Sequence, residues 1–243
     1  MTTINRYIII FFIICLSLFS CKRGRDKVVE PAIELAKRMS FAGNLDSAMS
    51  IYNSLIVKQG EVPFVLNELA LIHKDKGEFN LALDYLTRAI KADSANHVFF
   101  NNRGNIYQSL GMFKEAESDY SNSIKINEKY PPAYNSRGYL MFLMEKYNEA
   151  IYDYTNAIIL DSSYSVAFSN RAIAFFQINK LDKALSDFNM ALVLNPKLSK
   201  SYINRGITKF KLNDMDGACN DWQAAARLGE QEGHKLYSTY CNN

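Results

Sequence analysis

Small residues recur through most of this chain at intervals of 34 residues. When the chain is divided into segments of that length from Val29 onward, the twentieth residue of every segment is alanine. The six alanines are Ala48, Ala82, Ala116, Ala150, Ala184 and Ala218. A fixed period of this length predicts a stacked array of supersecondary units, because no single unit can bury its apolar face alone.

Other positions of the period indicate what each unit is. Position 8 is always small, and it holds Ala36, Ala70, Gly104, Gly138, Ala172 and Gly206. Position 24 carries a ring in five repeats, namely Tyr52, Tyr120, Tyr154, Phe188 and Trp222. Small residues let two helices approach closely while large ones fill the remaining gaps. Each unit is therefore predicted to be a helical hairpin.

The turn of each hairpin is expected at position 15. Glycine or asparagine, which readily form a left-handed helix cap, occurs there in five repeats, as Gly43, Gly77, Gly111, Asn179 and Asn213.

These residues resemble the tetratricopeptide repeat family. The third repeat carries the resemblance with Gly104, Tyr107, Gly111, Phe113, Ala116 and Tyr120, and the fifth with Ala167, Phe168, Ala184, Phe188, Ala191 and Pro196. The resemblance implies an all-α fold, a right-handed α-solenoid whose concave groove binds peptides or helices of partner proteins. The expected repeats span 29–62, 63–96, 97–130, 131–164, 165–198 and 199–232, and a short capping helix follows over 233–243.

Composition agrees with a folded chain that does not bind nucleic acid. Apolar residues make up 48% of the sequence, enough for an ordinary core. The 28 basic and 25 acidic residues leave a formal charge of +3 and are scattered, so no basic patch for nucleic acid is indicated.

The first 20 residues belong to a different class. A basic start is followed by an apolar run over 8–19, as in a signal peptide. The tetrapeptide from Leu18 to Cys21 resembles the lipobox of bacterial lipoproteins. The resemblance implies removal of residues 1–20, lipidation of Cys21 and a linker over 21–28. The protein is then expected in the bacterial envelope, anchored by lipid on the periplasmic or outer face of a membrane.

Two alternatives to lipidation remain open, a secretory signal cleaved elsewhere and an uncleaved signal anchor. Basic residues directly after the apolar run resist translocation, and they are Lys22, Arg23, Arg25 and Lys27.

The last four repeats have an arginine at position 7 and an aspartate at position 23, whereas repeats 1 and 2 have neither. The pairs are Arg103 and Asp119, Arg137 and Asp153, Arg171 and Asp187, and Arg205 and Asp221. Because an unpaired buried charge is costly, charges that occur together predict ion pairs between the two helices of a repeat. The alternative is that the arginines line a site for an anionic ligand, although the aspartates would cancel their field.

The resemblance also implies which residues form the groove, because the concave wall of this family comes from the first helix of each repeat. Amides, rings and lysines occupy the corresponding positions: Asn101, Asn102, Asn105, Ser109, Asn135, Tyr139, Asn170, Phe176, Gln177, Lys200, Asn204 and Lys211. Amides can bond both donors and acceptors of an extended peptide, and rings add apolar contact. The alternative is a solvated surface without a ligand. The family's clamp for chaperone tails is matched only by Asn170 and Lys200, so it is not expected here.

Two cysteines of the repeat region, Cys219 and Cys241, lie at equal distances from an expected turn near Glu230. Antiparallel helices would bring them face to face, and an oxidising compartment would permit a disulfide. Two separate buried thiols are the alternative.

We find no catalytic motif in this sequence. The histidines His73, His97 and His234 are far apart and fit no zinc or acid-base pattern. We therefore expect no enzyme activity, no metal and no cofactor.

The leading functional hypothesis is a lipid-anchored adaptor of the envelope that binds a protein or peptide partner in its groove. A structural subunit that assembles through its convex face is a second hypothesis, and an enzyme or glycan binder that uses the groove rings is a third.

Overall fold

The computed structural model describes residues 30–241, and all of its secondary structure in that range is α-helical. The predicted all-α repeat fold is confirmed. The expected signal segment, the linker and Cys21 lie outside the described residues. The chain divides into two compact units, Met1–Ser94 and Ala95–Asn243, which are described separately below.

The first unit contains two helix pairs. Residues 30–41 are helical and precede α2 (Leu45–Gln59), and α3 (Pro63–Asp75) is followed by α4 (Phe79–Ala92). Helix α3 packs against both α2 and α4. Their shared core includes the fully buried Ala48, Tyr52 and Leu69.

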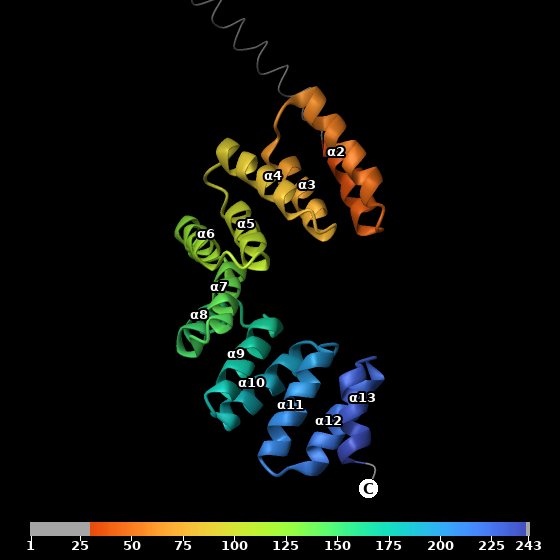
Figure 1. Ribbon diagram of the computed structural model, residues 1–243, viewed down its shortest axis with the longest axis vertical. Coiled ribbons are helices and arrows are strands. Elements are labelled where there is room, and N and C mark those ends of the chain that lie inside the picture. The colour runs from red at the N-terminus through yellow and green to blue at the C-terminus, as the bar shows by residue number, and fades with distance from the viewer. Residues whose placement is uncertain (1–29, 242–243) are drawn as a thin grey trace, which may run out of the picture. The chain divides into compact units, whose positions relative to one another are not determined.

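The second unit contains four helix pairs and a last helix (Figure 1). The pairs are α5 (His97–Ser109) with α6 (Phe113–Ile126), α7 (Pro131–Leu143) with α8 (Tyr147–Leu160), α9 (Ser165–Gln177) with α10 (Leu181–Leu194), and α11 (Ser199–Lys211) with α12 (Met215–Arg227). The first helices contact one another in succession, α5 with α7, α7 with α9 and α9 with α11. The last helix, α13 (Gln231–Tyr240), begins two residues before the boundary expected from the period.

Close contact at positions 8 and 24 holds each pair together. A β-carbon added at Gly104 would lie 2.7 Å from Tyr120 Cε1, and one added at Gly206 would lie 2.5 Å from Trp222 Nε1. The rings of Tyr120 and Trp222 are buried. Glycine therefore provides the space that the ring fills, because an extra methyl group would overlap it.

The turn between the two helices has the same conformation in every repeat. Position 15 has a positive φ in all six repeats, including Gly111 at 73° and Asn179 at 58°. Repeat 4 places Glu145 there with φ 61°, although the left-handed region costs a residue other than glycine about 1 kcal/mol. The turn conformation is thus imposed by the helices on either side of it.

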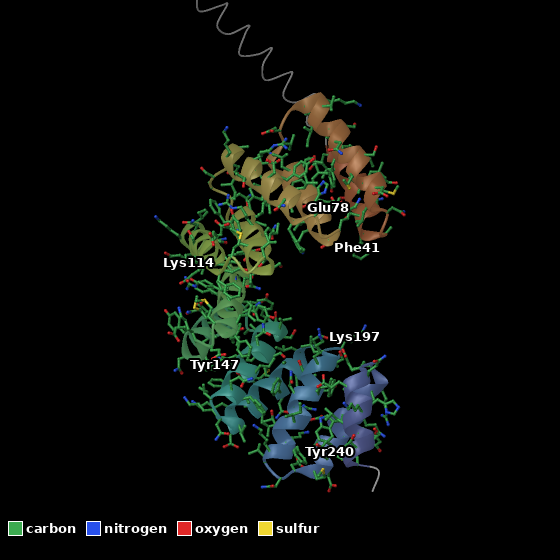
Figure 2. All side chains as sticks on the ribbon, in the orientation of Figure 1. Phe41, Glu78, Lys114, Tyr147, Lys197 and Tyr240 are labelled. Atoms are coloured by element: carbon green, nitrogen blue, oxygen red, sulfur yellow. A yellow bond between two sulfur atoms is a disulfide. The ribbon has the colours of Figure 1, made fainter. Side chains whose placement is uncertain are left out.

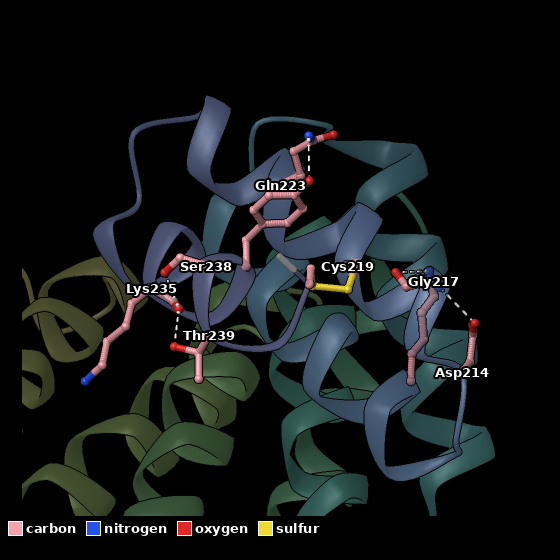
Figure 3. The surroundings of a disulfide bond; sticks show 10 residues. Asp214, Gly217, Cys219, Gln223, Lys235, Ser238 and Thr239 are labelled. Carbon is pink, nitrogen blue, oxygen red and sulfur yellow. Dashed lines mark hydrogen bonds between the residues drawn. A yellow bond between two sulfur atoms is a disulfide. The ribbon is translucent and has the colours of Figure 1, made fainter. Parts of the chain in front are cut away.

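The last helix is attached to the repeat before it by several contacts. Cys219 and Cys241 form a disulfide with a Cα–Cα distance of 5.8 Å (Figure 3). Ser199 Oγ donates a hydrogen bond of 2.6 Å to Glu230 Oε1 at the start of α13. The ring of Tyr240 lies 5.7 Å from that of Trp222. Helix α13 therefore covers the end of α12.

Arginine and aspartate join the two helices of each pair in the second unit. Each arginine donates two parallel hydrogen bonds to the aspartate sixteen residues later. The shortest N–O distances are 2.7 Å for Arg103 and Asp119, 2.8 Å for Arg137 and Asp153, 2.7 Å for Arg171 and Asp187, and 2.5 Å for Arg205 and Asp221. All four aspartates are buried. The hydrogen bonds to Asp153 raise the pKa of the Arg137 guanidinium, so this arginine stays charged.

The same arginines also connect neighbouring repeats, which the sequence did not predict. Arg137 Nη1 donates to Ser121 Oγ at 3.3 Å in the preceding repeat. The corresponding bonds join Arg171 to Thr155 at 3.0 Å and Arg205 to Asn189 at 2.9 Å. Each of these three guanidinium groups thus holds its own helix pair together and ties that pair to the one before it.

Replacement of Asp153 by alanine should lower the free energy of unfolding by about 2 to 4 kcal/mol, because it leaves Arg137 partly buried without its carboxylate. Asp182→Ala, which removes an exposed aspartate of α10, should change it by less than about 0.5 kcal/mol. Urea denaturation followed by circular dichroism measures both. Unchanged stability of Asp153→Ala together with a gain in anion binding would contradict the structural role and favour the anion-site alternative.

Candidate functional site

The first helices of the second unit carry the groove residues expected from the sequence. Those that are exposed or half-buried are Asn102, Asn105, Ser109, Asn135, Tyr139, Asn170, Phe176, Gln177, Lys200, Asn204 and Lys211. Asn101 is the exception, because only 4% of its surface is exposed. We therefore do not include Asn101 in the surface offered to a ligand.

Amide side chains on this surface form contacts within and between repeats. Asn170 Nδ2 donates a hydrogen bond of 3.0 Å to Asn135 Oδ1 and so links α9 to α7. The hydroxyl of Tyr120 donates to Asn105 Oδ1 at 2.9 Å. Burial raises the pKa of the Tyr120 phenol, so this hydroxyl remains a donor at neutral pH. Part of the amide surface is thus fixed in orientation before any ligand arrives.

Two cavities lie between α9 and α11. The smaller has a volume of about 90 Å³ and is lined by the apolar side chains Ile173, Phe176, Phe188 and Ile207, together with Gln177 and Asn204. The larger, about 330 Å³, is lined by Val166, Ser169, Asn170, Ile173, Lys197, Leu198, Ser199, Lys200, Ser201, Asn204 and Glu230. Ile173 and Asn204 line both. The two cavities therefore adjoin, and we call them together the repeat 5–6 groove.

Two buried hydroxyl groups lie in contact in the lining of the larger cavity. Ser169 Oγ and Ser201 Oγ lie 2.8 Å apart, and both residues are buried. Lys200 and Lys197 are exposed at its edge; Figure 2 labels Lys197 in the turn before α11. At the other end of the groove, Lys211 Nζ lies 4.3 Å from the centre of the Phe176 ring.

Sequence reasoning identified groove residues on both α9 and α11 but missed those that come from turns and from a second helix. The lining residues Lys197, Leu198 and Glu230 lie in turns, and Phe188 comes from a second helix. A rule that takes groove residues only from first helices cannot find them. The missed residues could have been found from the stacking of consecutive repeats, because stacking brings the turn before α11 beside α9.

Family models match three of the six repeats. One model described as a tetratricopeptide repeat matches residues 98–130 and 165–198, and a second with the same description matches residues 65–96. Residues 65–96, 98–130 and 165–198 are therefore tetratricopeptide repeats. No curated protein matches the sequence significantly.

Solved structures share this fold at low sequence identity. PilF of Pseudomonas aeruginosa is 18% identical with a TM-score of 0.77, and the match covers 89% of this chain and 99% of that one. A tetratricopeptide repeat protein from Parabacteroides merdae is 20% identical with a TM-score of 0.68, over 88% and 84% of the two chains. YrrB, a protein with an unusual peptide-binding site, is 20% identical with a TM-score of 0.57, over 77% and 96%.

Tetratricopeptide folds generally serve as non-catalytic interaction scaffolds, and neither matching family model describes an enzyme. Within residues 30–241, no group of three or more His, Cys, Asp or Glu side chains is placed to hold a metal ion. Over the same residues, no helix combines the length and apolar character needed to cross a membrane.

A cavity in repeats 3 and 4 offers a second candidate site. Its volume is about 510 Å³, and it is lined by Glu117, Arg137, Met141, Asn148, Glu149, Tyr152 and Asp153. Second helices of this unit expose apolar side chains, with 67% of Tyr152, 73% of Ile159 and 77% of Val193 accessible. These exposed side chains are the ones that the second functional hypothesis, assembly through the convex face, would use.

Proposed function

We propose that this protein is a non-catalytic scaffold that binds an extended segment of a partner protein in the repeat 5–6 groove. The observation that carries the proposal is the pair of adjoining cavities between α9 and α11, one lined mainly by apolar side chains and one lined by both polar and apolar side chains. An apolar cavity gives affinity to a side chain, while nearby amide groups bond to a main chain and fix its direction. Interaction with proteins or peptides is also the general role of tetratricopeptide repeats.

We further propose that the scaffold is anchored by lipid at Cys21 on the periplasmic or outer face of a bacterial membrane. Support comes from the sequence from Leu18 to Cys21 and from the apolar run before it. A disulfide between Cys219 and Cys241 is consistent with an oxidising compartment. Two or more acyl chains would give stable attachment.

Assembly through the convex face is the competing function, and the exposed Tyr152 is the observation that favours it. Its ring is the only aromatic side chain at position 22 among the six repeats.

Replacement of Asn204 by arginine should weaken capture of the partner by about tenfold or more, because the longer side chain enters both cavities. Asn220→Arg makes the same chemical change on the exposed face of α12 and should leave capture unchanged. Affinity purification from crosslinked native cells, with quantitative mass spectrometry of the captured proteins, measures both. If Asn204→Arg captures the same proteins while Tyr152→Ser loses them, the partner binds the convex face instead.

Replacement of Cys21 by alanine should abolish incorporation of radiolabelled palmitate and release the protein from the membrane fraction, because it removes the acylated thiol. Cys219→Ala provides the control and should keep both the label and the membrane association. Wild-type protein that takes up no palmitate would refute the lipid anchor but not the groove.

A further inference from the structure

We propose that the repeat 5–6 groove selects an extended segment in which an apolar side chain lies between two side-chain carboxylates. This inference rests on the proposed function and specifies its partner by charge and spacing.

The charge distribution of the second unit is the first observation. The four helices α5, α7, α9 and α11 contain no aspartate or glutamate. Their arginines at position 7 are neutralised by the aspartates of the second helices. Any charge left on this surface is therefore positive, and it comes from lysine.

The lysines of the groove fall into paired and unpaired groups. Lys209 Nζ lies 2.9 Å from Asp221 Oδ2, a carboxylate that it shares with Arg205. Among residues 30–241, no carboxylate lies within ion-pair distance of Lys197, Lys200 or Lys211. The one carboxylate that lines the larger cavity, Glu230, accepts a hydrogen bond from Ser199. Three exposed ammonium groups around this groove are thus available to a ligand, against one carboxylate that is already bonded.

The positions of these lysines relative to the apolar cavity are the second observation. Lys197 and Lys200 border the larger cavity, at the start of α11. Lys211 is the last residue of α11 and is held over Phe176, which lines the apolar cavity. Between them, Ile207 and Ile173 face the apolar cavity. Positive charge therefore borders the apolar cavity at both ends of α11.

The length of α11 fixes the spacing of the ligand. Lys200 and Lys211 are eleven residues apart, which at 1.5 Å per residue is about 16 Å along the helix. An extended chain covers about 3.3 Å per residue, so about five residues span the same distance. The ligand is expected to place its two carboxylates about five residues apart, with the apolar side chain near the middle.

The preference should be confined to this end of the array. Helices α5 and α7 contain no lysine, and the amides and rings of their surface carry no net charge beyond the paired arginines. An acidic segment therefore gains no charge contact from repeats 3 and 4, which contribute only amides and rings.

Selection from a random peptide library tests the proposal. Peptides are displayed within a carrier protein, so that no free terminal carboxylate is present, and they are selected on the full chain purified in detergent. We expect enriched peptides to carry an apolar residue between two acidic residues about five positions apart. A synthetic version with glutamine in place of both acidic residues should bind about 25-fold more weakly, because each exposed charge contact contributes about fivefold.

Charge-reversed variants locate the effect. Lys200→Glu and Lys211→Glu should each lower the affinity for the acidic peptide by about fivefold or more. Lys183→Glu is the matched control, because Lys183 is also exposed beside a ring, 5.7 Å from Phe175, but belongs to α10. It should leave binding unchanged, and the melting temperatures of all three variants should match that of the wild type.

The outcomes separate this inference from the proposed function. Enriched peptides that lack acidic residues, but whose binding is lost in Asn204→Arg, would overturn the charge selection and leave the groove in place. No enrichment, or enrichment that Asn204→Arg does not affect, would overturn both. Selection of acidic peptides only when their own carboxyl terminus is free would show recognition of a chain end and contradict the side-chain spacing.

Discussion

The close approach of two helices at positions 8 and 24 is the contact on which the rest of this structure depends. Where position 24 is tyrosine or tryptophan in the second unit, position 8 is glycine, as with Tyr154 and Gly138. Where it is Phe188, position 8 is Ala172, and both lie in one buried cluster. This match of volumes sets the distance between the two helices of a pair. The distance in turn allows an arginine on the first helix to reach an aspartate on the second.

Neutralisation of the arginines has a consequence for binding. Because each buried aspartate accepts two hydrogen bonds from its arginine, the first helices carry charge without presenting it to a ligand. The first unit has no charge at these positions: Leu69 at position 7 of repeat 2 is buried in its core, and Ile51 and Tyr85 at position 23 of repeats 1 and 2 pack against that core. Lysines then become the charged groups that can distinguish one ligand from another, and among the first helices of the second unit they occur only on α11.

The sequence was sufficient for the fold because its period is carried by buried residues. Helices α3, α5, α7, α9 and α11 begin 34 residues apart, at Pro63, His97, Pro131, Ser165 and Ser199. The left-handed turn at Glu145 was not predictable from residue preference, because the flanking helices impose it. The bond from Arg171 to Thr155 was also missed, since it joins residues of different repeats that share no local pattern. Cavities depend on how two repeats meet, so Phe188 and Glu230 became groove residues only in three dimensions.

Site-specific photocrosslinking in native cells tests the central claim, that a partner lies between α9 and α11, most directly. A photoreactive residue is placed at Ile207, which lines the apolar cavity, or at Ile159, which is exposed on a second helix. If the partner lies between α9 and α11, the photoreactive residue at position 207 forms a covalent adduct with a partner protein, and the one at position 159 forms none with that protein. An adduct from position 159 alone would contradict the account and place the partner on the convex face.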